Sequence, residues 1–199
     1  MPQHWIQTDE VEDVAGSIRH IIRVSQFLGQ DPQTWKWVAV ALHSALQGAC
    51  ICHLTTTAVP LGAVTPQNAE KSLAYFEDSR SNPNAKRPRT HLMGLPDLLK
   101  AVRKPCSAGD RSNSVGIAIS DCEFNSLRRF HENIRNQFVH FEPMGWSIDV
   151  SGIPAIARLV ARIIGEMLHI GYAFRHQEDV RRAEMQQSLQ ALVLIEWPI

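Results

Sequence analysis

The sequence predicts an all-α protein. Apolar residues recur at the three- and four-residue spacing of a helix along most of the chain. No internal repeat is visible, and the alternating segments are too few and too short for a sheet. Helix-start signals precede several of the periodic segments. Several long amphipathic helices of this kind favour an up-and-down four-helix bundle with additional short helices.

Most of the expected helices have a recognisable start or end. Acidic residues crowd the start of the first helix, where the helix dipole favours anions, and Gly29 ends it. Asp31–Pro32 and Thr65–Pro66 each have the pattern of a cap followed by a first-turn proline. Ser120 and Glu123 form a capping box. We therefore expect helices at residues 8–28, 31–55, 65–78, 96–103, 120–141, 154–175 and 178–196.

One helical domain is expected to span residues 1–199, with two inserted loops. Residues 79–91 contain two prolines, four cations and no carboxylate, and residues 104–114 are also polar. With the two shorter helices, the long basic loop would form an excursion between the long helices. Residues 143–146 have the composition of a turn, and residues 147–150 alternate like a very short strand.

The composition gives no global attraction for nucleic acid. The chain has 20 Lys and Arg and 20 Asp and Glu, so its formal charge is zero and any basic surface must be local. The N-terminus lacks the pattern of a signal peptide. The longest apolar run, residues 38–54, is shorter than the roughly 20 residues of a membrane span and is interrupted by polar side chains. We expect a cytoplasmic protein that does not bind membranes.

The sequence suggests neither a metal nor a cofactor. Cys50 and Cys52 lie in an apolar helical run, and their spacing does not match the usual zinc pairs, so buried, reduced thiols are expected. The histidines also lack the spacing of a zinc site. A metal-dependent bundle enzyme is therefore the least supported of the functions considered.

The most informative polar residues lie near the end of the helix expected at residues 120–141. Asn133, Asn136 and His140 share one helical face, with Arg135 beside them and Gln137 nearby. On an otherwise apolar helix these residues are costly unless they line a cleft or a subunit boundary. An imidazole can move protons near neutral pH, and an arginine fork can hold a phosphate.

A purely structural interpretation is also open. Glu132 follows Arg128 by four residues and precedes Arg135 by three, so Arg135 could belong to a solvated ion-pair ladder. His140 could cap the C-terminus of its own helix, where a cation is favourable. The residue types alone leave both interpretations standing.

The segment Arg135-x4-His140 resembles the R-x4–6-H signature of the HEPN superfamily, in the form with a polar residue, here Asn136, after the arginine. Bulky apolar residues surround the histidine, as in that family. The resemblance implies a HEPN-type bundle acting as a metal-independent endoribonuclease, often a toxin or abortive-infection component, that works as a homodimer without a cofactor. Some toxin members have a tyrosine where this chain has Glu142.

The resemblance also implies roles for the motif residues. His140 would act in acid–base chemistry while the RNA 2′-OH attacks the adjacent phosphate. Arg135 would bind that phosphate and Asn136 would support the site. RNA rather than DNA is the implied substrate, with an antitoxin of a toxin–antitoxin pair, or another protein, as a further partner. Because some family members are non-catalytic, the alternative is a helical interaction or assembly module that uses the same motif at a dimer or partner interface.

Further residues have both a functional and a structural interpretation. Asn133, Gln137, Arg158 and Arg162 are candidates for substrate binding, and for the last two a role within the bundle or on its surface is the alternative. His43 and Gln47 could add polar lining to the site, but core or cap roles are expected for them. Packing roles rather than base stacking are expected for Trp35, Trp37 and Trp146. The cations of residues 79–91 could contact an RNA backbone or simply be solvated: Arg80, Lys86, Arg87 and Arg89.

Overall fold

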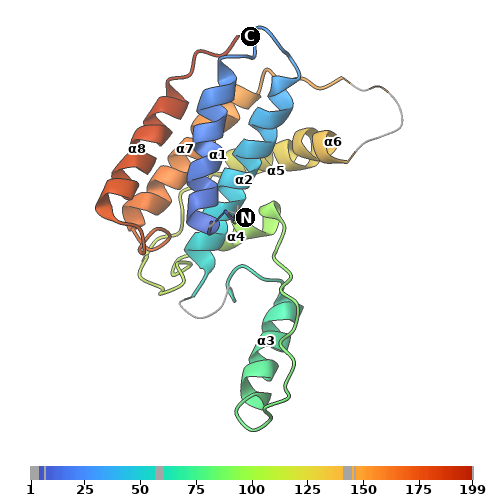
Figure 1. Ribbon diagram of the computed structural model, residues 1–199, viewed down its shortest axis with the longest axis vertical. Helices are drawn as coiled ribbons and strands as arrows, with labels where there is room; N and C mark the ends of the chain where they lie inside the picture. Colours follow the sequence, from blue (N-terminus) through green and yellow to red (C-terminus); the bar gives the residue numbers. More distant parts are fainter. Residues whose placement is uncertain (1–4, 7, 57–60, 141–144, 146, 199) are drawn as a thin grey trace.

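The computed structural model describes residues 5–6, 8–56, 61–140, 145 and 147–198, and its regular secondary structure is helical (Figure 1). The described residues form no strand, apart from an isolated antiparallel bridge between Val64 and Leu92. The predicted all-α class is therefore confirmed. The helices are α1 (Glu10–Ser25), α2 (Thr34–Leu54), α3 (Pro66–Asp78), α4 (Leu95–Val102), α5 (Asp121–Arg129), the π-helical η1 (Phe130–Arg135), α6 (Asn136–Val139), α7 (Ile153–Ile170) and α8 (Asp179–Val193).

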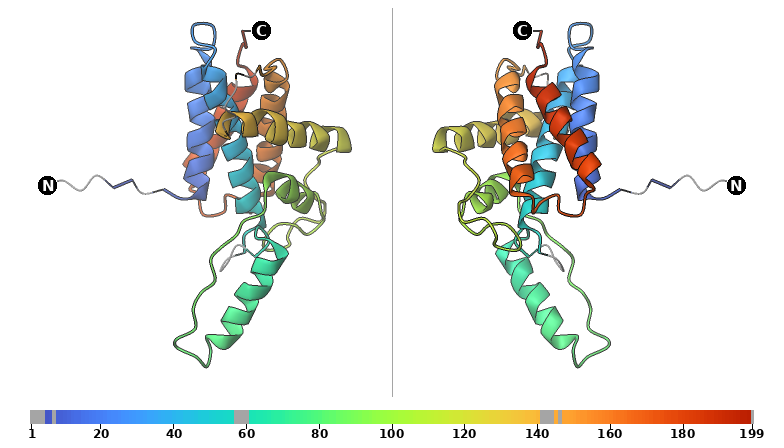
Figure 2. Two further views of the ribbon diagram at one scale, coloured as in Figure 1. Left: turned by 90° about the vertical axis from the view of Figure 1, so that its right-hand side faces the viewer. Right: turned by 90° about the vertical axis from the view of Figure 1, so that its left-hand side faces the viewer.

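Four helices enclose the main core. Both α1 and α7 pack against α2 and against α8, and fully buried residues such as Ile18, Leu42, Leu46 and Ile164 fill the space between them. The pairs α1/α2 and α7/α8 are antiparallel, whereas α2 and α7 run in the same direction (Figures 1 and 2). This order differs from a simple up-and-down bundle, because the chain crosses the molecule before it enters α7.

That crossing is made by α5, η1 and α6, which lie across the four helices (Figure 2). The capping box is present: Ser120 Oγ accepts from the Glu123 amide, and the Glu123 carboxylate accepts from the Ser120 amide at 2.8 Å. Leu127 and Phe130 are fully buried, and η1 packs on α2. The segment expected as one bundle helix over 120–141 is thus a transverse helix with a π-helical centre.

Other helix ends differ from the sequence expectation for local reasons. The turn at Gln26 to Gln30 shortens α1, although Leu28 stays buried. The carboxylate of Asp31 accepts from the Gln33 amide, and α2 begins only at Thr34. Gly171 adopts a left-handed conformation with φ of 86°, which ends α7 at Ile170 rather than near residue 175.

Two further expectations concern the segment after α6. Residues 147–150 are irregular and form no strand. Phe141, Glu142 and the predicted turn at 143–146, except Gly145, lie outside the described residues.

Helix α2 packs against α1, α4, η1 and α7. A side-chain carbon on Gly48 would come within 2.8 Å of a methyl group of Val14, so the glycine permits the close approach of α1 and α2. Cys50 and Cys52 are buried thiols here. Contrary to expectation, α2 is long and apolar enough to cross a bilayer by length and composition, but 67% of its apolar window is buried, as in the core helix of a bundle.

An arm formed by residues 61–93 projects from one end of the molecule (Figures 1 and 2). It consists of α3 and the segment that returns beside it, and its base is held by the bonds from the Thr65 amide to the His91 carbonyl and from the Met93 amide to the Ala63 carbonyl. Along α3 only Asn68 is buried. The expected basic loop is therefore the return segment of a projecting arm.

Burial predicts a large stability effect at the transverse helix. Phe130→Ala removes a ring that is 1% exposed, and we expect the free energy of unfolding to fall by about 3–5 kcal/mol. Phe27→Ala, at a ring 45% exposed, should cost under about 1 kcal/mol. Urea unfolding of the two variants tests this. Equal losses would contradict the placement of α5 and η1 against the core.

Candidate functional site

The candidate site lies where η1 crosses α2. A π-helix has wider turns than an α-helix, and such segments are frequent at functional sites. Here the wider turns change which side chains face α2: Phe130 enters the core, while His131 and Arg135 come to lie beside His43. The site therefore joins two regions that are far apart in the sequence.

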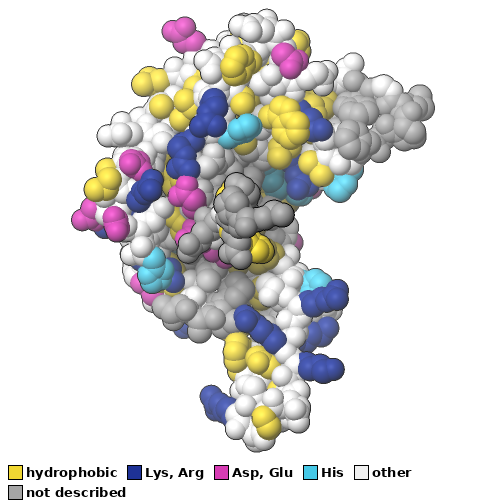
Figure 3. All heavy atoms as spheres, in the orientation of Figure 1, with side chains coloured by type: hydrophobic (Ala, Val, Ile, Leu, Met, Phe, Trp, Pro, Cys, Tyr) yellow, Lys and Arg dark blue, Asp and Glu magenta, His cyan; other side chains and the backbone are white. Residues whose placement is uncertain are grey.

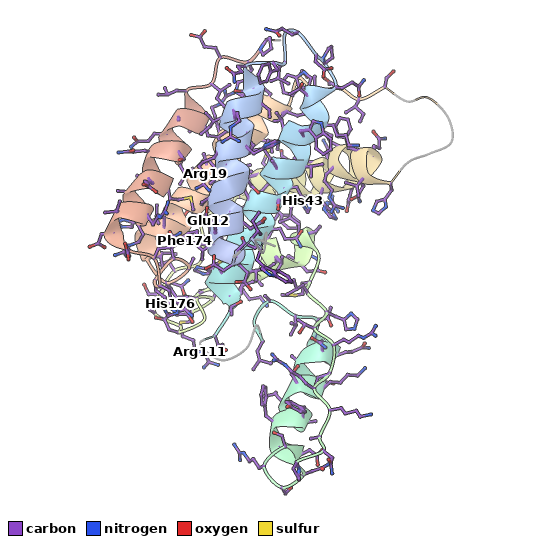
Figure 4. The ribbon with its side chains drawn as sticks, in the orientation of Figure 1. Glu12, Arg19, His43, Arg111, Phe174 and His176 are labelled. Atoms are coloured by element: carbon purple, nitrogen blue, oxygen red, sulfur yellow. The ribbon has the colours of Figure 1, made fainter. Side chains whose placement is uncertain are left out.

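The closest contact in the site joins two imidazoles. His43 Nε2 and His131 Nδ1 are 2.8 Å apart, and the rings are stacked with their centroids 5.0 Å apart at an interplanar angle of 20°. Figure 4 labels His43 on the side of α2 that faces the transverse helix. Since a hydrogen bond needs one donor and one acceptor, at least one of the two rings is neutral.

Burial and a nearby cation keep these rings neutral. Burial, then the charge of Arg135 and then His131, lower the pKa of His43 to about 3. Burial and then Arg135 also lower the pKa of His131, while Glu132 opposes them. Both imidazoles are therefore uncharged at neutral pH, and Arg135 is the cation that acts on both of them.

Arg135 is held by a neutral partner. Its Nη1 donates to Asn136 Oδ1 at 3.0 Å, and its Nε is buried without a hydrogen-bond partner. Among the residues described, no carboxylate forms an ion pair with Arg135. The ladder through Glu132 is thus not formed, and the charge of Arg135 is open to an external anion.

The guanidinium faces an open groove of mixed charge. Besides Arg135, the groove is lined by His43, Gln47 and Gly48 from α2 and by Asp9, Glu10 and Asp13 around the start of α1. The carboxylates have local roles: Asp9 accepts from the Glu12 amide, and Asp13 accepts from the Ser44 hydroxyl. One wall of the groove is therefore acidic and the other cationic. His43 and Gln47 line it, beyond the core or cap roles expected for them.

The motif residues do not form a single row on one helical face. His140 follows the last turn, with φ of −107° and ψ of 99°, and its amide donates to the Asn136 carbonyl at 2.7 Å. Its side chain is exposed, as are those of Asn133 and Gln137, whereas Asn136 is half-buried. The structure thus joins Arg135 and Asn136 directly and places His140 at the exposed end of the helix.

The two candidate arginines of α7 have different surroundings. Arg162 is engaged: it bonds to the Ala118 carbonyl at 2.8 Å and to Glu123 at 2.9 Å, and lies 3.5 Å from Glu166. These contacts tie α7 to the start of α5, so Arg162 has the role within the bundle given as the alternative. Arg158 is exposed.

The site contains His131, which no sequence pattern predicted, and His43 has a larger part in it than its core or cap role implied. The position of His43 could have indicated a polar contact, because an imidazole on the most apolar helix needs a buried partner. His131 lies four residues before Arg135, but only the folded chain brings it to α2.

No protein-family model, no curated protein and no solved structure matches this chain. The described residues also contain no group of three or more His, Cys, Asp or Glu side chains that could hold a metal ion.

The lowered pKa of His43 predicts an acid-sensitive contribution to stability. The folded value is about 3 against an ordinary 6.5, so the unfolded chain binds the proton first, and stability present above about pH 6.5 is lost as the pH falls toward 3. Between about pH 7 and about pH 4, we expect this group to contribute a loss on the order of 3 kcal/mol. His43→Gln should lose correspondingly less stability than the wild type when both are unfolded in urea at the two pH values. Parallel losses would contradict a buried neutral His43.

Proposed function

We propose that this protein is a HEPN-like, metal-independent endoribonuclease or RNA-binding protein of the toxin or defence type, with a HEPN-type bundle, that acts as a homodimer. One observation carries the proposal: Arg135 has no described carboxylate partner, is tethered to the neutral amide of Asn136, and lies beside two neutral imidazoles at a π-helical segment. An unpaired arginine fork in such a place suits a phosphate.

The proposed binding step uses the charge of Arg135. Because His43 and His131 are neutral, the positive charge offered to the phosphate is that of Arg135. A bound phosphate would also place a hydrogen-bond acceptor near the unpartnered Nε of Arg135. Asn136 would keep the guanidinium in place through its bond to Nη1. The acidic wall around Asp9 and Asp13 repels a polyanion, so RNA would approach Arg135 from the side of η1 and α6.

The proposed chemical step uses His140. An imidazole would accept the proton of the 2′-OH as its oxygen attacks the phosphorus, and a protonated imidazole would donate to the departing 5′-oxygen. The products are a 2′,3′-cyclic phosphate and a free 5′-OH. A dimer that faces its two exposed helix ends together would supply one His140 for each proton transfer. This is why the proposal includes a second copy.

A non-catalytic interaction module is the second candidate, and the mixed groove favours it. Asp9, Glu10 and Asp13 on one wall and Arg135 on the other could receive a protein segment that carries both charges. In that function Arg135 would contribute to partner binding and the protein would cleave no RNA.

The enzyme proposal predicts loss of cleavage in His140→Ala. With EDTA present, the wild type should cut total RNA to products ending in 2′,3′-cyclic phosphate. The variant should be slower by about 10²-fold or more, because a proton-transfer group is missing. His169→Ala, at another exposed histidine, is the matched control and should cleave at the wild-type rate. Undiminished cleavage by His140→Ala would remove the basis of the mechanism.

Arg135→Ala separates the two candidate functions. In the enzyme, the variant should lose cleavage by about 10²-fold or more, and Arg135→Lys should recover only part of it, since lysine lacks the fork. The oligomeric state, measured by light scattering, should stay that of the wild type. In an interaction module, the variant would instead change the oligomeric state or partner binding, and neither protein would cleave RNA.

A further inference from the structure

The projecting arm is a defined structure rather than a loose loop. The side chain of Asn68 donates to the Arg89 carbonyl at 2.6 Å and accepts from the His91 amide at 3.0 Å, and this fixes the return segment against α3. At the tip, Asp78 accepts from the Asn82 side chain. Ser72, Tyr75, Phe76 and Pro88 are half-buried and fill the space between helix and return segment.

The arm presents cations that the rest of the protein leaves unpaired. Arg80, Lys86, Arg87 and Arg89 are all exposed, as is Lys71 on α3. None of them forms an ion pair among the described residues, whereas the arginines on α8 and the Lys100 side chain on α4 each pair with a neighbouring carboxylate. Figure 3 shows dark blue Lys and Arg side chains along the arm on this face.

The distribution of charge is uneven for a neutral chain. The chain carries equal numbers of cations and anions, yet residues 79–91 hold four cations and no carboxylate. The carboxylates of the arm, Glu70, Glu77 and Asp78, all belong to α3. Asp78 accepts a hydrogen bond from the Asn82 side chain at the tip. A cationic edge on a projecting element, away from the acidic groove, is suited to a polyanion.

We propose that the cationic edge of the arm, Arg80 with Lys86, Arg87 and Arg89, is a second RNA-binding surface that contacts the phosphate backbone independently of Arg135. The choice of RNA as the polyanion rests on the function proposed above. Three of these four cations are arginines, whose planar fork fits phosphate oxygens. The contacts are with the backbone, so binding through the arm is independent of base sequence and weakens with salt.

The test measures salt-dependent binding of a fluorescein-labelled, mixed-sequence single-stranded RNA by anisotropy, with EDTA, in the His140→Ala background. Lys86→Ala/Arg87→Ala/Arg89→Ala removes three cations while leaving the main-chain bonds to Asn68. We expect the slope of log K against log salt to fall in magnitude by about 2, and the affinity at about 200 mM salt to drop about tenfold or more. Replacing both arginines by lysine should preserve the slope, because the charge count is unchanged.

The matched control removes three ion-paired cations elsewhere: Lys100→Ala/Arg181→Ala/Arg182→Ala. It should leave affinity and slope close to the parent values. An equal loss in control and arm variants would attribute the effect to net charge and overturn the proposal. Unchanged binding by the arm variant would also overturn it. So would arm-dependent binding to phosphatidylserine vesicles without arm-dependent RNA binding, which would assign the arm to a membrane surface.

The outcome is distinguishable from failure of the proposed function. If the wild type cleaves no RNA but the arm variant loses RNA affinity, the arm assignment stands and the nuclease proposal fails. If the wild type cleaves RNA and the arm variant binds with the same affinity and slope as its parent, the nuclease proposal stands and the arm assignment fails.

Discussion

The arrangement of the candidate site depends on one partly buried polar contact, the bond between His43 and His131. An imidazole in the middle of the most buried helix is unfavourable without a partner, and α2 has none on its own turns for His43. The transverse helix supplies that partner at 2.8 Å. The wider π-helical turn satisfies this contact while Phe130 remains in the core. Arg135 is positioned as a consequence.

The distribution of charge follows a similar logic. The start of α1 carries carboxylates that suit the helix dipole and accept local hydrogen bonds, and this makes one wall of the groove acidic. The cations that form no ion pair among the described residues include Arg135 and, on the arm, Arg80, Lys86, Arg87 and Arg89. A neutral chain therefore presents local fields of both signs, and each region favours a different kind of ligand.

The sequence predicted well what depends on neighbouring residues. The capping box at Ser120 and the proline start of α3 were both visible as short patterns, and the all-α class followed from periodicity. The predicted end of α7 was wrong, because the apolar pattern continues past Gly171, whose left-handed backbone ends the helix.

Features that depend on residues far apart in the chain could not be predicted from local sequence patterns. The π-helical turn is a tertiary compromise between burial of Phe130 and pairing of His131, and no local pattern encodes it. The expected helical row of Asn133, Asn136 and His140 assumed regular α-helical turns, so it could not anticipate this register. The contact of His43 with a residue far along the chain was likewise invisible. Arg162 was a reasonable candidate by position, but the carboxylates that hold it come from another helix and its own next turn.

The base of the arm has a consequence for how this architecture can vary. The two segments that enter and leave the arm are hydrogen-bonded to each other. The Met93 amide donates to the Ala63 carbonyl, and the Thr65 amide donates to the His91 carbonyl. Since the ends already meet, the segment between them can be shortened, lengthened or exchanged with little change in loop-closure entropy. The sequence of the arm can therefore diverge without altering the path of the chain from α2 into α4.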